Sequence, residues 1–228
     1  MLTLRNADAR GQADFGWLKS RHSFSFGRYY DAKHMGFSAL RVINDDWVAA
    51  GAGFDTHGHR DMEIITLVLQ GAIVHQDSAG NQKVLPAGEF QLMSAGSGIY
   101  HSEFNASASE PLRFLQIWIQ PESFGGKPGY QQQAFAQTQG LTLIASPDGR
   151  DHSMQLKQQA LLYRLALAAG QPLSYALTGK NLYLHLISGQ LQLEGVTLQA
   201  GDAVMLSQQA LLQLTANEEV DALVFDLP

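Results

Sequence analysis

Short runs of β-favouring residues, each closed within a few positions by Gly, Pro, Asn or Ser, fill the chain from residue 37 onward. This rhythm is typical of strands joined by tight turns. In the first half the runs cover residues 39–43, 63–69, 72–75, 90–93 and 112–119. The first run is followed by Asn44-Asp45-Asp46, which predicts a turn. No sustained helical period competes with the runs, so the pattern indicates a barrel or a sandwich of strands.

The composition changes between residues 121 and 140, where Gly-Gly-Lys-Pro-Gly precedes a glutamine-rich stretch. Such a sequence suits an exposed connection between domains. The strand rhythm then resumes over residues 141–145, 161–167, 182–187, 191–193, 203–206 and 222–227. Because 228 residues are enough for two domains, we predict an N-terminal domain over residues 1–130 and a C-terminal domain over residues 131–228.

A short internal similarity favours duplication of one unit. It joins Val68-Leu69-Gln70-Gly71 before Leu85-Pro86-Ala87-Gly88-Glu89 to Leu186-Ile187-Ser188-Gly189 before Leu198-Gln199-Ala200-Gly201-Asp202. The second copy has lost the histidines of the first. Chance agreement between two sets of turn residues is the alternative explanation.

The net charge of −6 repels a phosphate backbone, and the sequence shows no basic patch, so we expect no nucleic-acid partner. The chain has neither the apolar start of a secretory signal nor a run that approaches the length of a membrane span, which predicts a cytoplasmic protein without a membrane partner. Because the chain contains no cysteine, any bound metal must be held by nitrogen and oxygen.

Two tripeptides carry the candidate chemistry: His57-Gly58-His59 and His101-Ser102-Glu103. On a β-strand, residues two positions apart share a face, with Cα atoms roughly 6.6 Å apart. That separation suits two ligands on one ion. If the sheet curls, the two pairs converge and form a site of three histidines and one carboxylate. The alternative is two exposed polar strand faces.

The other histidines occur singly, and single histidines are more often surface or core residues than ligands. We therefore do not expect metal binding by His22, His34, His75, His152 or His185.

The residues around the two pairs resemble both signatures of the cupins, which are small double-stranded β-barrels. Within that superfamily the chain resembles the pirins, in Gly53-Phe54-x-x-His57-x-His59-Arg60-x-Met62-Glu63, in Gly88-Glu89-Phe90-Gln91-x-Met93-x-Ala95-Gly96-x-Gly98-x-x-His101-Ser102-Glu103, and in Leu115-Gln116-Ile117-Trp118-Ile119. The resemblance rests on specific residue strings in the first half of the chain. In the second half it extends only to the expected architecture, a second barrel. It implies an all-β fold of two tandem cupin-type β-barrels with a metal site in the N-terminal barrel only.

The resemblance also bears on the choice of carboxylate. Cupins usually supply a glutamate three or four residues after the second histidine, where Glu63 stands, whereas the pirin pattern places the ligand at Glu103. We expect Glu63 to lie lower on the strand that carries His59, and thus behind the ligands. The expected metal ligands are His57, His59, His101 and Glu103.

Three imidazoles and one carboxylate leave two positions open on a six-coordinate ion, an arrangement with which non-haem iron binds a substrate beside dioxygen. The resemblance implies one divalent ion, Fe(II), while the ligand types also admit Mn, Ni, Cu, Co or Zn. It further implies an oxidoreductase similar to quercetin 2,3-dioxygenase, which cleaves a flavonol with dioxygen and releases carbon monoxide, with Glu103 as general base.

Two other functions stay open. One is an iron-dependent redox-sensing regulatory protein that acts on a protein partner, and the other is a cupin similar to sugar isomerases. Quercetin itself could stand in for another flat aromatic substrate. Because imidazoles bind metal in the neutral form, we expect metal affinity to fall below pH about 6.5.

Overall fold

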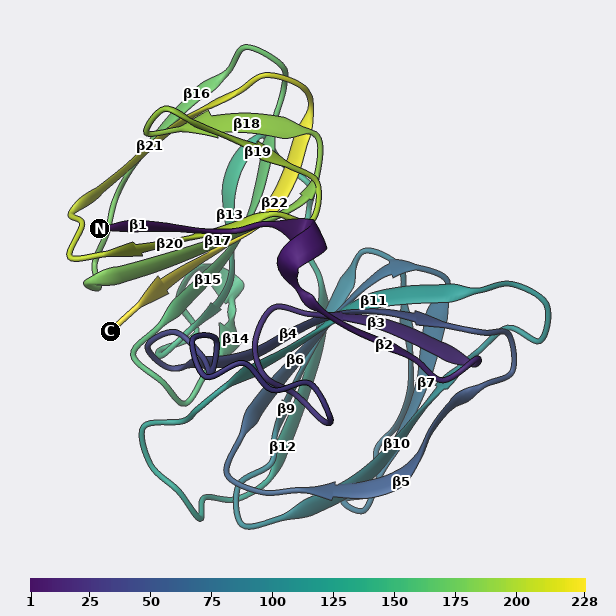
Figure 1. Ribbon diagram of the computed structural model, residues 1–228. Coiled ribbons are helices and arrows are strands. Elements are labelled where there is room, and N and C mark those ends of the chain that lie inside the picture. The colour runs from purple at the N-terminus through teal and green to yellow at the C-terminus, as the bar shows by residue number, and fades with distance from the viewer. The chain divides into compact units, whose positions relative to one another are not determined.

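The computed structural model describes all 228 residues and consists almost entirely of strands and turns (Figure 1). It divides into two compact units, one formed by Gly11–Phe135 and the other by Met1–Arg10 together with Ala136–Pro228. The helical segments are the short 3-10 turns η1 (Ala7–Ala9) and η2 (Arg150–His152). No helix of the structure has the length and apolar character that crossing a membrane requires.

The unit Gly11–Phe135 contains two antiparallel sheets. The strands of the larger sheet are β2 (Gly11–Asp14), β3 (Leu18–His22), β4 (Leu40–Val48), β6 (Glu63–Gln70), β9 (Glu89–Ser94), β11 (Leu112–Ile119) and β12 (Gly129–Ala134). Those of the smaller sheet are β5 (Gly53–His59), β7 (Ala72–Asp77), β8 (Gln82–Pro86) and β10 (Ile99–Asn105). The orders are β12-β9-β6-β11-β4-β3-β2 and β5-β10-β7-β8. A core cluster with side chains from both sheets, including Val68, Ile73 and Phe114, fills part of the space between them.

The other unit repeats this design. Its larger sheet consists of β1 (Leu2–Arg5), β13 (Gly140–Ser146), β14 (Met154–Gln155), β15 (Leu161–Leu167), β17 (Asn181–Ser188), β20 (Ala203–Ser207) and β22 (Val220–Leu227). Its smaller sheet consists of β16 (Pro172–Ala176), β18 (Gln190–Leu193), β19 (Val196–Gln199) and β21 (Leu211–Ala216). The orders are β1-β20-β17-β22-β15-β13-β14 and β16-β21-β18-β19. A leucine-rich cluster with residues from both sheets forms the core.

The all-β, two-barrel prediction is confirmed, and the predicted runs 112–119 and 161–167 coincide with β11 and β15. The internal similarity also has a structural counterpart. Gly71 and Gly189 end β6 and β17 with φ of 80° and 83°, and Gly88 and Gly201 precede β9 and β20 with φ of 89° and 87°. Glycine populates these left-handed conformations without steric cost, so the matching strings encode the same two turns in each barrel.

The predicted turn at Asn44-Asp45-Asp46 is wrong, because β4 continues through it to Val48. All three polar residues are buried, with exposed fractions of 2%, 2% and 4%. Asp45 stays in the strand by pairing with Arg113 of β11, whose Nε and Nη2 donate to it at 3.0 and 2.9 Å. Turn propensity gives way here to ion pairing and to the ladder of hydrogen bonds in the sheet interior.

The stretch expected as a connection between the domains contains an edge strand. β12 pairs with β9 over Gly129–Ala134, and Gln132 donates to Glu89 at 2.8 Å. The expected boundary between residues 130 and 131 therefore falls inside β12, and the compact unit ends at Phe135. Glutamine side chains that bond to the neighbouring strand replace the apolar alternation by which a strand is usually predicted.

The first ten residues also depart from the expected division, because β1 pairs with β20 of the unit that contains Ala136–Pro228. Leu2 and Leu4 pack against the leucine-rich core of that unit, and the backbone N–H of Ala7 donates to Asp202 at 2.7 Å. Sequence proximity assigns these residues to the wrong unit, since strand pairing is decided by the partner and not by position in the chain.

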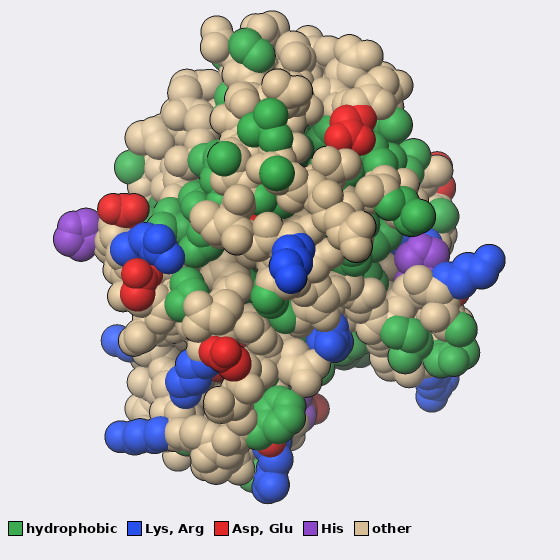
Figure 2. Space-filling view, turned by 90° about the vertical axis from the view of Figure 1, so that its left-hand side faces the viewer, with side chains coloured by type: hydrophobic (Ala, Val, Ile, Leu, Met, Phe, Trp, Pro, Cys, Tyr) green, Lys and Arg blue, Asp and Glu red, His purple; other side chains and the backbone are tan.

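On the face drawn in Figure 2, lysine and arginine side chains stand singly, and several lie next to an acidic side chain. The charges on that face are therefore mixed in sign.

Replacing both Leu2 and Leu4 by Ala should lower the free energy of unfolding by about 3 kcal/mol, because two partly buried leucines leave the core. Urea denaturation followed by far-ultraviolet circular dichroism measures the change. Thr3→Ala is the matched control, since Thr3 is exposed between the two leucines. Equal stability of the double variant and the control would show that β1 contributes nothing to this core.

Candidate metal centre

The two histidine-containing tripeptides lie on neighbouring strands of one sheet. β5 carries His57 and His59, β10 carries His101 and Glu103, and His101 stands directly opposite His57 in the antiparallel register. The two pairs therefore converge as expected, and they do so without requiring any curl of the sheet. The pairs meet because β5 and β10 are hydrogen-bonded partners, whose opposed side chains on one face lie close together.

The register between the two strands shifts beside the site. Across from His101 stands His57, yet two residues further along β10 Glu103 stands across from Phe54, so β5 contains an extra residue. Such a bulge re-aims the side chains next to it. Here the imidazole of His57 turns so that its Nδ1 donates to the backbone oxygen of Asp55 at 2.8 Å.

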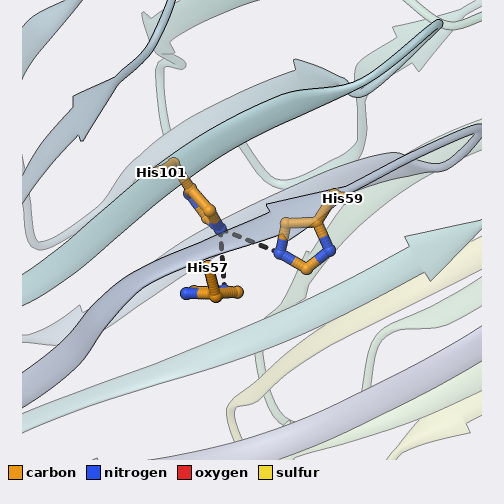
Figure 3. Close-up of side chains that lie close together, drawn as sticks. All are labelled: His57, His59 and His101. Carbon is orange, nitrogen blue, oxygen red and sulfur yellow. Dashed lines mark hydrogen bonds between the residues drawn. The ribbon is translucent and has the colours of Figure 1, made fainter.

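The three imidazoles point toward one another (Figure 3). Nε2 of His101 lies 2.9 Å from Nε2 of His59 and 3.1 Å from Nε2 of His57. Because a neutral His57 has its proton on Nδ1, its Nε2 presents a lone pair. A single proton on Nε2 of His101 serves only one of its two neighbours. The cluster thus has more lone pairs than protons at its centre.

Glu103 joins this cluster from the side of His101. It is 3% exposed, and its Oε2 accepts a hydrogen bond from Nε2 of Gln116 at 3.0 Å, while its Oε1 has no partner. The donor atoms of Glu103, His101 and His75 lie within 4.8 Å of one another, and those of His57, His59 and His101 form a second such group. The structure therefore brings all four expected residues into two groups that share His101.

His75 is a member of the cluster that sequence reasoning passed over. It lies opposite Glu103 in the register of β7 with β10, is fully buried, and pairs through Nε2 with Asp77 at 3.1 Å. That pairing leaves Nδ1 as an unprotonated nitrogen, and it has no partner. A histidine that stands alone in its strand gives no sequence signal of this position, because only the pairing of β7 with β10 creates it.

The remaining single histidines lie elsewhere. Nδ1 of His34 bonds to Asp31 at 2.7 Å, His152 is exposed, and His185 is buried in the unit that contains Ala136–Pro228. His22 bonds through Nδ1 to Asn44 at 2.8 Å.

The structure corrects the expected place of Glu63. It does not continue the strand of His59, because β5 ends at that histidine and Glu63 begins β6 in the other sheet. Between them Asp61 takes a left-handed conformation with φ of 51°. Glu63 is 1% exposed and accepts a hydrogen bond from Ser94 at 2.9 Å. Its side chain is thus engaged within the larger sheet.

Burial dominates the electrostatics of the cluster. It lowers the pKa of His59 to about 4 and that of His101 to about 2, and the neighbouring imidazole of His57 adds to both shifts. Burial also raises the pKa of Glu103 to about 7, against the opposing effect of the hydrogen bond from Gln116. The metal-free cluster therefore resists positive charge on His59 and His101 and holds a proton on Glu103 below neutral pH.

A cavity of about 780 Å³ opens onto the cluster within the unit Gly11–Phe135. Much of its lining is aromatic, from Phe15, Trp17, Phe26, Tyr29, Phe54 and Trp118. Its polar lining includes Ser20, His22, Asn44, Asp46, Glu103 and Gln116. Its size and mostly apolar wall are typical of sites for small organic ligands.

Comparison with known proteins identifies the family to which this chain belongs. Residues 3–119 match the family model described as Pirin, and residues 143–227 match the one described as Quercetinase C-terminal cupin domain. The chain belongs to the pirin family. The resemblance inferred from the sequence is thus confirmed, and the second match assigns a cupin domain to the half of the chain that carries none of the expected ligands.

Relatives match this pirin along its whole length. A protein of Escherichia coli strain K12 named quercetin 2,3-dioxygenase is 46% identical over 229 residues, which cover 100% of this chain and 99% of the relative. A pirin-like protein of Caulobacter vibrioides is 40% identical and 99% of each chain is covered. The crystal structure of the Escherichia coli pirin YhhW in complex with nickel(II) is 46% identical, with a TM-score of 0.97 and coverage of 100% and 99%.

In the metal-free protein His59 should take up a proton only near pH 4, because burial and the adjacent imidazole of His57 disfavour its cation. A pH titration of the imidazole Cε1–H resonances by NMR measures this. A midpoint for His59 between pH 6 and 7 would contradict the packing of the three rings. The expected fall in metal affinity below pH about 6.5 stays a prediction. Burial raises the pKa of Glu103 to about 7, so this ligand gains a proton in that range, whereas burial keeps the pKa values of His59 and His101 well below it.

Proposed function

We propose that this chain is a metal-dependent dioxygenase that cleaves a flavonol such as quercetin, with one divalent ion held by His57, His59, His101 and Glu103. The observation that carries the proposal is the convergence of three imidazole Nε2 atoms, 2.9 and 3.1 Å from the central one, beside a buried carboxylate and a cavity suited to an aromatic ligand. The name of the 46% identical relative and the nickel complex of YhhW support it.

The donor set fits a cation. Two imidazole nitrogens bound at right angles, each about 2.1 Å from one ion, lie about 3.0 Å apart. The two Nε2 distances from His101 agree with that spacing. The bond from His57 Nδ1 to the oxygen of Asp55 is also the one that metal-binding histidines use to fix their orientation. A cation would use the lone pairs that the three rings cannot satisfy among themselves.

Glu103 is the residue that we propose as the proton acceptor. The bound ion supplies Lewis acidity toward the 3-hydroxyl and 4-carbonyl oxygens of the flavonol. Glu103 accepts the hydroxyl proton on its carboxylate, which the 3.0 Å hydrogen bond from Gln116 to Oε2 holds in place.

The cavity wall orients the substrate and excludes water. Trp118 contacts His59 edge to face, with ring centroids 5.0 Å apart, and Phe26 packs on Trp118 at 5.4 Å. Trp17 and Phe54 form a similar pair at 5.2 Å on the same cavity. Such rings offer flat apolar surface to a planar ligand. The reaction consumes one dioxygen and yields carbon monoxide and a depside ester, which together contain every atom of the flavonol and the dioxygen.

The identity of the metal is part of the proposal. Fe(II) is our choice for this chain, and the nitrogen and oxygen donors also admit Mn, Ni, Cu, Co and Zn. The nickel(II) complex belongs to YhhW. A cytoplasmic location and a redox-sensing role with a protein partner stay predictions of the sequence.

Removing one imidazole should remove the metal before it removes the fold. His57→Ala, His59→Ala and His101→Ala should each lower metal content at least about tenfold, because three donors hold the ion less tightly than four. Elemental analysis after dialysis measures metal content, and circular dichroism measures folding. His34→Ala is the matched control, since His34 bonds to Asp31 outside the cluster. Full metal content in the three variants, or a lost β-sheet signal, would contradict the proposed site.

The iron-loaded protein should consume quercetin and dioxygen in equal amounts. Loss of flavonol absorbance, an oxygen electrode and gas analysis for carbon monoxide measure the stoichiometry. Glu103→Gln should lower kcat about 10²-fold or more, because proton acceptance is lost, and the metal content of this variant is measured in parallel. Quercetin loss no faster than with His101→Ala would end the dioxygenase proposal.

A further inference from the structure

The cavity has a second polar region, which lies on the larger sheet and not on the strands of His57, His59 and His101. Along β4, Asn44 and Asp46 share a face with Val42 and Val48, and Val48 belongs to the core between the two sheets. Asn44 and Asp46 both line the cavity. Two adjacent polar positions on the inner face of a central strand are uncommon, because such positions are normally apolar.

The register of the larger sheet extends this region across three strands. Asn44 of β4 stands between Gln116 of β11 and His22 of β3, and Asp46 stands opposite Ser20 of β3. Gln116 is the residue that donates to Glu103. Since neighbouring strands lie about 4.8 Å apart, the region reaches about 10 Å from the strand that contacts Glu103.

Within this region Asp46 is the side chain whose bonding is incomplete. Ser20 stands opposite it in the register, yet Oδ1 of Asp46 has no partner although the residue is 4% exposed. Leaving a buried oxygen unpaired destabilises a fold, and this oxygen lines a cavity from which a ligand can reach it. Its neighbour Asp45 points to the other face and is fully paired with Arg113. Of these two carboxylates on one strand, that of Asp45 has both oxygens paired, and that of Asp46 has one oxygen unpaired.

We propose that Ser20, Asn44 and Asp46 form a subsite that recognises a hydroxyl group of the substrate remote from the oxygens that meet the metal. This inference rests on the proposed function and deepens it. The subsite selects planar phenols of more than one ring that bear a hydroxyl at the far end. A ligand with one aromatic ring is too short to reach both Gln116 and the strand of Ser20.

The chemistry of Asp46 suits a hydroxyl, which both donates and accepts. Burial, followed by the charges of Asp45 and Glu103, raises the pKa of Asp46 to about 7 against the effect of Ser20. Near neutral pH its carboxyl group therefore donates when protonated and accepts when ionised. The amide of Asn44 accepts at Oδ1 from His22 at 2.8 Å when that ring nitrogen carries its proton, which holds the amide in place.

The test compares quercetin, which has hydroxyls on both outer rings, with 3-hydroxyflavone, which has only the chelating hydroxyl and carbonyl. Binding to the metal-free protein is followed by quenching of tryptophan fluorescence, because Trp17 and Trp118 line the cavity. The value of kcat/KM is measured for both ligands with the iron-loaded protein. Asp46→Ala removes the polar group and Asp46→Asn keeps its size. Asp148→Asn is the control, since Asp148 is exposed, pairs with Arg150 and does not line the cavity.

Asp46→Ala should weaken quercetin binding and lower its kcat/KM about tenfold, the effect of one lost hydrogen bond, while the values for 3-hydroxyflavone change by less than about twofold. Asp46→Asn should show a smaller loss in the same direction, and Asp148→Asn should leave the ratio between the two ligands unchanged. If Asp46→Ala does not fold, Asp46→Asn decides the question.

An unchanged ratio in the Asp46 variants, or equal losses for both ligands, would overturn the subsite. A protein that binds quercetin selectively through Asp46 but consumes neither ligand would keep the subsite and refute the dioxygenase proposal. The two failures are therefore distinguishable.

Discussion

Three imidazole nitrogens crowd into one small space at the edge of a cavity, and they cannot satisfy one another. Nε2 of His101 lies 2.9 and 3.1 Å from its two neighbours, and burial together with mutual repulsion disfavours the cations of His59 and His101. Unpaired nitrogens in a buried cluster lower stability, unless a bound metal ion accepts their lone pairs. The rest of the unit Gly11–Phe135 can be understood as the support that holds these rings, and the proposed chemistry follows from the same unmet lone pairs.

The support comes from both sheets of that unit. The smaller sheet provides the imidazoles through the pairing of β5 with β10, and a bulge in β5 turns His57 toward the others. The larger sheet provides polar side chains, among which Gln116 holds Glu103 and Asp46 faces the cavity. A row of polar residues inside a barrel is costly for stability, so its presence beside the imidazoles favours a ligand with oxygen atoms along its length.

Much of the fold could be predicted because the strands of a barrel are short, apolar and punctuated by turns. The pattern predicts β11 with its observed bounds. The spacing within the two histidine-containing tripeptides is enough to predict that the side chains of each pair share a strand face. The pattern predicts a strand that ends at residue 43, because the three residues that follow have turn propensity. Only pairing with neighbouring strands keeps Asn44, Asp45 and Asp46 in β4. The position of His75 beside Glu103 depends on the register of β7 with β10, which single-strand patterns do not contain. His101 belongs to two groups of possible donors for the same reason, because β10 pairs with β5 on one side and with β7 on the other.

The central claim is that His57, His59 and His101 share one cation. Anomalous diffraction from crystals of the iron-loaded protein, measured on both sides of the iron absorption edge, tests it most directly. The account predicts one peak at about 2.0–2.3 Å from all three Nε2 atoms, within bonding reach of Glu103. A peak elsewhere in the molecule, or none within reach of these rings at full iron loading, would contradict it.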